Sequence, residues 1–399
     1  MKLMHLSDLH LGKRLYEFSL LEDQRYILAE ILDIVDRERP QAVLIAGDVY
    51  DRSSPSAEAV TLLDSFLSRL AERQLQIFLI SGNHDSAEKL AFGARLMDAS
   101  GVHFARVCDG RAEPLLLSDA DGETAIYMLP FVRPAQVRRW YGGEAEIDSY
   151  TAALRTAIEH MEIDPERRSV LLAHQFVTGA ARADSEEIYV GGTENVDADV
   201  FAPFDYVALG HLHSPQSIAR ETLRYCGTPL KYSFSEAGQQ KSVTMVELKA
   251  KGEAAVRTVP LRPRHDLRCL RGSFADLCSR EAAAQADEDR CAAAPPQEDY
   301  LQITLTDEEE IPDAAARLRV FYPNLMKLEY DNRRTRSRET ADGAVQVEEK
   351  SPLTLLNELY EKQNGQPLDA RQKQLAQELI RDVFGAAAAG KEKPCDPSD

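Results

Sequence analysis

The sequence predicts a layered α/β fold: a two-sheet sandwich flanked by helices, followed by a small α+β domain and C-terminal helices. Two observations predict it. Through the first half of the chain, short apolar segments alternate with segments of helical periodicity, the pattern of a layered α/β core. Later segments read as strands with no helix between them, and the composition changes near 260–263, where we expect the core to end.

The individual elements are predicted from apolar periodicity and from end signals. Strands are expected at 2–6, 42–46, 76–80, 170–173 and 206–209, and helices at 22–39 and 56–73, the latter capped by Ser56. Three further strands, at 223–226, 242–248 and 255–259, follow one another without intervening helices. We expect these three to form a second, more antiparallel sheet that closes the sandwich.

The chain divides into five predicted parts. They are a large domain at 1–260, a small domain at 261–332 reading strand, helix, strand, helix, strand, a linker at 333–350, a helical segment at 351–385 and a disordered tail at 386–399. Within the small domain, the Ala-rich connection at 281–298 is expected to be a partly mobile helix or loop. Apolar stripes are expected at Leu355, Leu356, Leu359 and Tyr360, and at Leu375, Leu379, Ile380 and Val383. Such stripes need a partner surface or their own core.

The bulk composition limits the location and the partners. The formal net charge is −19, which argues against nucleic-acid binding because phosphates repel an acidic surface. No apolar run is long enough to cross a membrane and the N-terminus lacks a signal pattern, so we expect a cytoplasmic protein without membrane contact. The six cysteines show no C-x-x-C spacing and are expected to be free thiols.

Five predicted strands each run into polar residues able to bind a metal ion. These residues are Asp8, His10, Asp48, Asn83, His174, His211 and His213. In layered α/β folds the carboxyl ends of strands open onto one crevice, so we expect the seven side chains to converge. A mixed shell of Asp, Asn and His suits manganese, iron or zinc better than magnesium.

Seven ligands are too many for one ion and suit two ions that share a bridging ligand. Asp48 stands alone after its strand, as a bridging carboxylate would. Two ions about 4 Å apart can hold both the attacking and the leaving oxygen of an in-line phosphoryl displacement. The pattern therefore predicts a two-metal phosphoesterase.

The strings DLH, GDVYD, GNHD, AHQ and GHLH occur in this order and together resemble the calcineurin-like metallophosphoesterase superfamily. The resemblance implies that Asp8, His10, Asp48 and His213 bind one ion and that Asp48, Asn83, His174 and His211 bind the other. It implies that His84 assists at the scissile phosphate without binding metal, that Asp85 orients His84, and that a metal-activated water is the nucleophile.

Some polar residues near these strings have simpler interpretations. Asp85 could be a local turn residue, and Asp51 could cap a helix or support a ligand. His5, His103 and His160 are interpreted as structural residues.

Beyond the metal-binding strings, the chain resembles the bacterial SbcD family, which supplies the nuclease component of the SbcCD complex. The segments that carry the likeness are MKLMHLSDLHLGK, EIYVGGTENV, FDYVALGHLH and GTPLKYSFSE. The resemblance implies manganese-dependent cleavage of DNA, as a 3′-to-5′ double-strand exonuclease and a single-strand or hairpin endonuclease, in repair, replication and recombination. Asp51 stands where some archaeal relatives have a histidine, so the role of that histidine cannot be transferred.

The same resemblance implies particular partners and domain roles. An SbcC-type ATPase would hydrolyse ATP and bind the C-terminal helices, residues 261–332 would form a DNA-capping domain, and the chain would be a homodimer within a heterotetramer. The Gly191–Gly192 pair predicts a tight turn that either approaches a phosphate backbone or is an ordinary loop. The net charge of −19 argues against DNA binding, but basic residues cluster locally, for example at Arg262, Arg264, Arg268 and Arg271, and local charge matters more than the total. We expect the chain to bind DNA weakly without the ATPase.

Two other classes of function compete with this interpretation. The same metal core could serve a protein phosphatase or a cyclic-nucleotide phosphodiesterase, but neither needs a capping domain or a helical tail. A non-catalytic scaffold would have a degenerate metal site, whereas the ligand set is complete.

Overall fold

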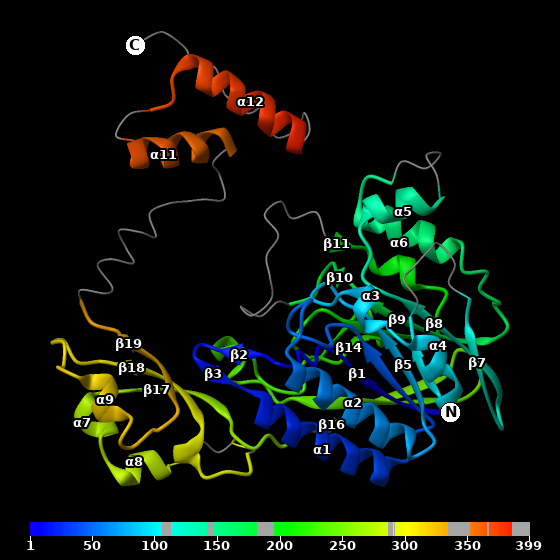
Figure 1. The fold of residues 1–399 in the computed structure, drawn as a ribbon, viewed down its shortest axis with the longest axis horizontal. Coiled ribbons are helices and arrows are strands. Elements are labelled where there is room, and N and C mark those ends of the chain that lie inside the picture. Colours follow the sequence, from blue (N-terminus) through cyan, green and yellow to red (C-terminus); the bar gives the residue numbers. More distant parts are fainter. Residues whose placement is uncertain are drawn as a thin grey trace. The chain divides into compact units, whose positions relative to one another are not determined.

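The computed structural model describes residues 1–105, 113–141, 147–181, 195–285, 290, 292–333, 352–364 and 367–384. Two compact units are present, Met1–Tyr330 and Asp331–Asp399, and each is described by itself (Figure 1). No helix among the described residues is long and apolar enough to cross a membrane.

The first unit contains two six-stranded sheets. The first sheet has the order β16 (Ala254–Pro260), β15 (Ser242–Leu248), β1 (Lys2–Leu6), β4 (Ala42–Ala46), β5 (Gln76–Ile80) and β6 (Val102–Phe104). The second has the order β13 (Gln216–Ile218), β14 (Arg220–Tyr225), β12 (Tyr206–Gly210), β9 (Arg168–His174), β8 (Gly122–Leu129) and β7 (Leu115–Asp119). In each sheet the four strands that carry or flank the predicted ligands run parallel, so their carboxyl ends meet at one edge.

The two-sheet sandwich is confirmed, but the predicted membership of the sheets is wrong. β15 and β16 do not build the second sheet; β15 pairs antiparallel with β1 and extends the first sheet. The second sheet instead contains β9 and β12, with β14 added parallel to β12. The reason is that β1 would otherwise leave a buried edge with unpaired backbone groups, and β15 supplies its hydrogen-bonding partner.

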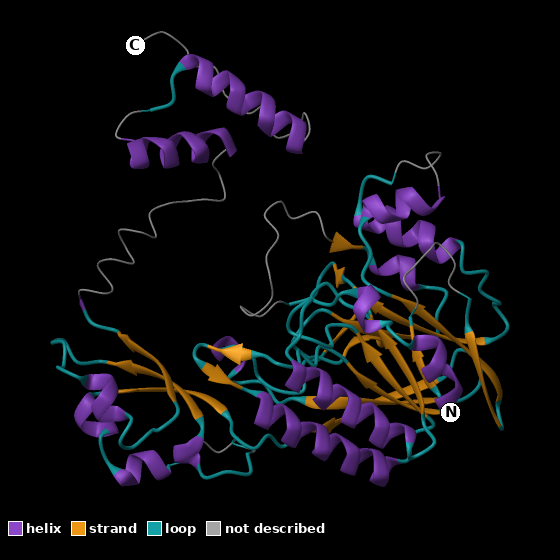
Figure 2. Cartoon of the chain, viewed as in Figure 1, coloured by secondary structure: helices purple, strands orange, loops and turns teal. Residues whose placement is uncertain are grey.

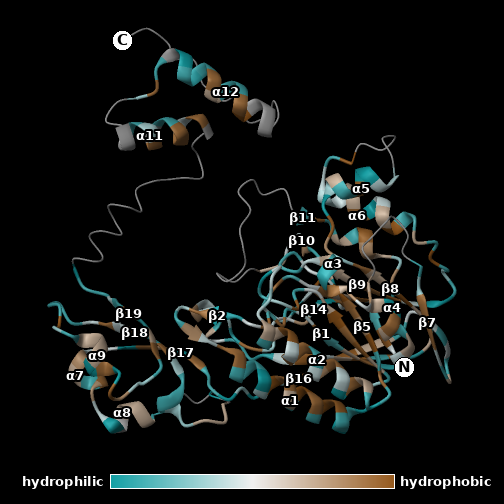
Figure 3. Cartoon of the chain, in the orientation of Figure 1, coloured by the Kyte–Doolittle hydropathy of each residue, from teal (hydrophilic) through white to brown (hydrophobic). Residues whose placement is uncertain are grey.

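Helices cover the outer faces of both sheets, as Figure 2 shows. α1 (Leu21–Glu38) and α2 (Ala57–Ala71) share one apolar core with the first sheet, and α5 (Pro134–Tyr141) and α6 (Tyr150–Glu159) share another with the second. A third core lies between the sheets and includes Leu3 and Tyr206, and the sandwich interior is correspondingly hydrophobic in Figure 3. Both predicted helices are confirmed, and the Ser56 side chain caps α2 by accepting from Ala59 N.

Shorter elements complete the core of the first unit. They are β2 (Arg14–Leu15), β3 (Phe18–Ser19), β10 (Phe176–Val177), β11 (Asn195–Val196), α3 (Ala87–Leu90), α4 (Ala94–Met97) and the 3-10 helices η1 (Asp98–Ser100), η2 (Ala198–Phe201), η3 (Phe234–Glu236) and η4 (Pro296–Glu298).

Residues 261–333, here called the small-sheet segment, form a separate three-stranded sheet. Its strands β17 (Leu267–Gly272), β18 (Tyr300–Leu305) and β19 (Leu325–Tyr330) are all parallel. The helices α7 (Phe274–Leu277), α8 (Arg280–Ala284) and α9 (Ala314–Leu318) connect them, in the predicted order. Part of the predicted mobile connection at 281–298 is helical or 3-10 helical, and residues 286–289 and 291 lie outside the described residues.

The second unit contains two helices, α11 (Pro352–Asn364) and α12 (Ala370–Phe384). Gln372 Nε2 of α12 donates to Tyr360 OH of α11 at 3.1 Å, and Leu368 N, just before α12, donates to Asn357 Oδ1 of α11 at 3.1 Å. Exposed leucines remain on both helices, at Leu356, Leu359, Leu375 and Leu379. The residues from 334 to 351 and from 385 onward, which include most of the predicted linker and the tail, lie outside the described residues.

A buried ion pair fastens the outer edge of the second sheet. Arg168 of β9 donates to both carboxylate oxygens of Asp119 on β7 and also to the carbonyl of Lys249. These bonds from Arg168 hold the pKa of Asp119 well below its usual range. A carboxyl whose pKa is lowered by folding stabilises the folded state above its unfolded pKa and loses that contribution as the pH falls.

We therefore expect Asp119→Asn to lower the free energy of unfolding by about 3 kcal/mol at pH 7, because a buried Arg168 would lose its partner. The difference from wild type should shrink below about pH 4, where the unfolded carboxyl becomes protonated. Urea unfolding at pH 7, 5 and 3 measures this, with Asp121→Asn as the exposed control. An undiminished difference at pH 3 would contradict the assignment.

Candidate two-metal centre

The seven predicted ligands lie at the carboxyl ends of β1, β4, β5, β9 and β12, where the two sheets meet. Backbone hydrogen bonds join the loops that carry them: Asp8 N donates to Gly47 O at 3.0 Å, and His10 N donates to Asp48 O at 2.9 Å. Two further bonds cross between the sheets. His211 N donates to Asp8 Oδ1 at 3.0 Å, and His174 Nδ1 donates to Ala46 O at 2.9 Å.

The Asp48 carboxylate lies at the centre of the group. Its Oδ2 is 3.3 Å from Nε2 of His174, 3.8 Å from Nε2 of His10 and 3.9 Å from Nε2 of His84. Among the described residues, two sets of side chains have ligand atoms close enough to hold an ion, His10–Asp48–His84 and Asp8–Asp48–His174. Both sets contain Asp48, which is the position that a bridging ligand requires.

The remaining ligands lie close to one another in two groups. In one group, Nε2 of His174 and Nδ1 of His211 each lie 3.0 Å from Oδ1 of Asn83. In the other group, the rings of His10 and His213 have centroids 5.1 Å apart. The side chains are therefore gathered as two adjacent clusters that share one carboxylate.

Several buried polar atoms in these clusters have no hydrogen-bond partner among the described residues. They are Oδ2 of Asp8 and both ring nitrogens of His10. A buried donor or acceptor without a partner costs about 1–3 kcal/mol, so such atoms are expected where another group binds. Carboxylate oxygens with imidazole nitrogens are the donor set of divalent transition metals, and the residues therefore fit two such ions.

The backbone is strained at the same positions. Asp8, His10, Asp48 and His211 have φ angles of 52°, 44°, 45° and 104°, in a region that L-residues rarely adopt. Strain of this kind persists where the surrounding structure enforces it and clusters at functional sites. A side chain at Gly82 would meet the Asp48 carboxylate, so glycine is needed there for close approach.

Burial and proximity shift the protonation of this centre. Burial raises the pKa of Asp8 to about 8. Burial opposes ionisation of Asp48 as well, but the His174 ring beside it outweighs burial and holds the pKa of Asp48 well below its usual range. Reciprocally, Asp48 overcomes the effect of burial on His174 and raises its pKa to about 9. Protons thus occupy the metal-free centre at neutral pH.

Asp85, which the family resemblance implies orients His84, does so through no direct bond to the ring. Asp85 accepts from the backbone amides of Val49, Tyr50 and Gly82 at 2.9–3.0 Å, and among the described residues it makes no hydrogen bond to the His84 ring. Nδ1 of His84 instead donates to the Asp51 carbonyl at 3.1 Å. The turn interpretation of Asp85 therefore describes its contacts, and the role in orienting His84 that the family resemblance implies stays a prediction, which the carboxylate could fulfil only by holding the turn that carries His84.

Asp51 lies beside a predicted ligand and does not cap α2, whose cap is Ser56. Its Oδ1 lies 2.7 Å from Nζ of Lys13 and 3.7 Å from Nδ1 of His10.

The three histidines interpreted as structural make contacts outside the centre. His5 bonds to Tyr206 OH between the sheets, His103 to Asp98 and Gln76, and His160 to the Thr156 carbonyl. Gly191–Gly192 and most of EIYVGGTENV lie outside the described residues.

Sequence reasoning missed residues that support the ligands from behind. Gln24 Nε2 donates to His10 O at 2.7 Å, and Tyr232 OH donates to Leu9 O at 2.6 Å. Oε1 of the buried Glu236 lies 3.5 Å from Nδ1 of His213. Burial would raise the pKa of Glu236, but His213 and Lys241 outweigh it and lower it to about 2. Glu236 and Tyr232 lie in GTPLKYSFSE, a segment whose only signal in the sequence was its family likeness.

The chain is similar to known proteins over almost its whole length. Residues 1–215 match the family described as calcineurin-like phosphoesterase, and residues 263–364 match the type 5 capsule protein repressor C-terminal domain. The SbcD component of the SbcCD nuclease from Staphylococcus epidermidis is 30% identical over 387 residues, which cover 95% of this chain and 98% of that protein. The protein of the same name from Staphylococcus saprophyticus is 29% identical, with the same coverage of both chains.

Among solved structures, a dimetal phosphatase from Danio rerio aligns with a TM-score of 0.36 and 11% sequence identity. The alignment covers 65% of this chain and 98% of that one.

The raised pKa values of Asp8 and His174 predict that metal binding releases protons. At pH 7 both groups hold a proton that an incoming divalent ion must displace, so affinity for Mn²⁺ should rise as the pH increases from 6 to 8. Calorimetric titration of the metal-free protein in buffers of different ionisation enthalpy counts the protons released. Binding that is independent of pH over this range would contradict the assigned protonation.

Proposed function

The chain belongs to the calcineurin-like phosphoesterase family and, within it, to the SbcD nucleases of SbcCD complexes, and from this premise we propose that it cleaves DNA phosphodiesters with two divalent ions. The observation that carries the proposal is the pair of ligand clusters sharing Asp48, with unpartnered buried atoms on Asp8 and His10. Calcineurin-like phosphoesterases use divalent metal ions, and the mixed oxygen and nitrogen donors favour Mn²⁺ over Mg²⁺.

We divide the ligands between the two ions as the family resemblance implies, whereas the ligand atoms that lie within reach of one another are those of Asp8, Asp48 and His174 and those of His10, Asp48 and His84. Asp8, His10, Asp48 and His213 would hold one ion, and Asp48, Asn83, His174 and His211 the other. The Nδ1–H of His174 is engaged by the Ala46 carbonyl, which leaves its Nε2 lone pair for a metal. When bound, the two ions supply an activated water and neutralise charge on the phosphate.

His84 is assigned as the proton donor to the leaving oxygen. Its side chain is 22% exposed, so substrate can reach it, unlike the fully buried His174. Its Nδ1–H bond to the Asp51 carbonyl fixes the ring and leaves Nε2 directed toward Asp48 and the metal clusters. Protonated at Nε2, this ring can donate to an oxygen as the phosphodiester bond breaks.

DNA must be bound despite the net charge of −19. Two divalent ions offset carboxylates at the centre itself, and local basic patches matter more than the total charge. Arg268 does not belong to such a patch because it is buried and paired with Asp299. We propose weak affinity of the isolated chain for duplex DNA, increased by an SbcC-type ATPase partner.

We also propose a role for each of the five parts of the chain within an SbcCD-type nuclease. Residues 1–260 would be the nuclease domain, 261–332 the DNA-capping domain and 333–350 the linker. The helical segment 351–385 would bind the ATPase, and 386–399 would be the tail. The exposed Leu356, Leu359, Leu375 and Leu379 give α11 and α12 apolar surface for a helical partner. The proposed biological setting is DNA repair, replication and recombination, with 3′-to-5′ exonuclease and hairpin endonuclease activities.

A homodimer is proposed through the surface next to the His84 loop. Phe92 and Leu96, in and beside α4, have 84% and 83% of their surface exposed. Large exposed apolar side chains so close together are typical of a protein contact, and a second copy of this chain is the occupant we propose.

The nuclease proposal is tested with Mn²⁺ and end-labelled duplex and hairpin DNA, with and without the ATPase partner. His84→Ala should lower cleavage by about 100-fold or more while Mn²⁺ binding persists, and Asp48→Ala should lose both. His160→Ala, an exposed histidine outside the centre, is the matched control. Turnover of a phosphopeptide or cyclic nucleotide, with no DNA cleavage under any condition, would favour the phosphatase or phosphodiesterase alternative.

The dimer is tested by light scattering after gel filtration. Wild type should have the mass of two chains, and Phe92→Glu or Leu96→Glu should give one, because a charge at the contact would be buried against an apolar partner. Val320→Glu is the control, since Val320 is also an exposed apolar residue but lies on the small-sheet segment. A wild-type monomer, or a dimer that survives both substitutions, would refute the contact.

A further inference from the structure

Two buried charged residues lie behind one predicted ligand, His213. Oε1 of Glu236 is 3.5 Å from Nδ1 of His213, and Oε2 of Glu236 is 2.6 Å from Nζ of Lys241. The Glu236 side chain is 0% exposed and that of Lys241 is 4% exposed. Buried ion pairs are costly to desolvate and add little stability compared with apolar residues, so this pair calls for a role other than packing.

The position of Glu236 determines which nitrogen of His213 is available. A carboxylate beside Nδ1 favours the tautomer with a proton there, and Nε2 then keeps its lone pair for a metal. Lys241 holds both ends of this arrangement, since its ammonium donates to Glu236 Oε2 and, at 2.8 Å, to the His213 carbonyl. Thr228 N donates to the same carbonyl at 3.1 Å.

We propose that Glu236 and Lys241 are positioning residues for His213 and that they connect this ligand to the small-sheet segment. This inference rests on the proposed metal site, and it adds that two residues outside the ligand set determine how well His213 binds its ion. Glu236 fixes the tautomer and orientation of the ring, and Lys241 fixes the carboxylate and the backbone of the ligand together.

The connection to the small-sheet segment runs through Lys241, its neighbour Gln240 and Lys231. Lys241 O accepts from Leu261 N at 2.9 Å, and Gln240 Nε2 donates to Leu261 O at 3.0 Å. Lys231, in the loop before η3, pairs with Asp266 of the segment at 2.8 Å.

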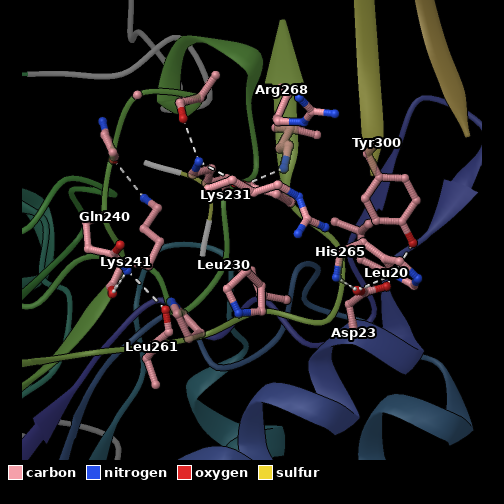
Figure 4. A pocket seen from close by; sticks show the side chains of 18 of the residues that line it. Leu20, Asp23, Leu230, Lys231, Gln240, Lys241, Leu261, His265, Arg268 and Tyr300 are labelled. Carbon is pink, nitrogen blue, oxygen red and sulfur yellow. Dashed lines mark hydrogen bonds and ion pairs between the residues drawn. The ribbon is translucent and has the colours of Figure 1, made fainter. Parts of the chain in front are cut away.

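Figure 4 shows the cavity that these residues surround, with Lys231 and Lys241 on its wall and His265 and Tyr300 directed at Asp23. The cavity, about 460 Å³ in volume, leaves open space between the core and the segment. Because Leu261 is bonded to Lys241 and Gln240, and Lys241 is bonded to the His213 carbonyl, a movement of the segment would reach His213 through these bonds.

The test measures metal binding by the full chain, with MnCl2 as the probe. Metal-free wild type should bind two ions by calorimetry. Glu236→Gln should weaken one of the two sites by about 10- to 100-fold, the usual effect of losing a carboxylate behind a ligating histidine, and leave the other site unchanged. Lys241→Met should act in the same direction. Lys251→Met and Glu38→Gln, which break ion pairs remote from the centre, should bind as wild type does.

Positioning is separated from packing by comparing two substitutions of Glu236. Gln keeps the volume and loses the charge, whereas Asp keeps the charge and loses a methylene. Glu236→Asp should therefore recover part of the Mn²⁺ affinity that Glu236→Gln loses. If Asp is no better than Gln, or if Glu236→Gln binds two ions as wild type does, positioning by Glu236 is refuted. Should neither Glu236→Gln nor Lys241→Met give a folded protein by circular dichroism, the pair is structural and the inference fails.

The link to the small-sheet segment has its own variant. Asp266→Asn removes the charge that Lys231 pairs with and leaves the bond from Lys231 to the Ala237 carbonyl, beside Glu236, in place, and it should weaken the same site by a few-fold. Unchanged affinity would refute the link. None of these measurements involves a substrate, so two intact Mn²⁺ sites without DNA cleavage would count against the nuclease proposal alone.

Discussion

The burial of one carboxylate, Asp48, is the constraint on which the rest of the structure depends. An ionised group held at 3% exposure needs a charged or polar partner, and the rings beside it, His174 and His10, come from different sheets. The two sheets therefore meet at their carboxyl ends and not only across their apolar faces. The left-handed backbone of Asp8, His10 and Asp48 and the missing side chain at Gly82 follow from the same requirement, because each brings a loop close to this carboxylate.

The ligands that could be predicted from sequence are those that directly follow a strand. Asp8, Asp48 and His174 follow short apolar strands, and parallel strands deliver their ends to one edge whichever sheet they join. For this reason the convergence could be predicted although the sheet membership of β15 and β16 could not. Pairing across a sheet is decided by which edge needs a partner, and no single strand carries that information.

What sequence did not reveal are contacts determined by turns. Asp85 turns back to three amides instead of toward His84, and the ring is held by the carbonyl of Asp51, a group that every residue possesses. Glu236 follows His213 by more than 20 residues and meets its ring only once η3 has folded against the core. Residues whose partners are backbone groups, or whose partners come from another loop, leave no periodic pattern to read.

Glu236 and Lys241 are a second buried charge pair, and the same rule applies to them: a buried charge needs a partner. Removing two charges from water is unfavourable, and an apolar pair of similar volume would pack the site between core and small-sheet segment at lower cost. The two charges have a role if the carboxylate is needed at Nδ1 of His213. The ammonium is then needed to keep that carboxylate ionised in a dry interior. The centre then consists of two layers. The inner one is organised by Asp48, and the outer one by Glu236, which Lys241 connects to the small-sheet segment.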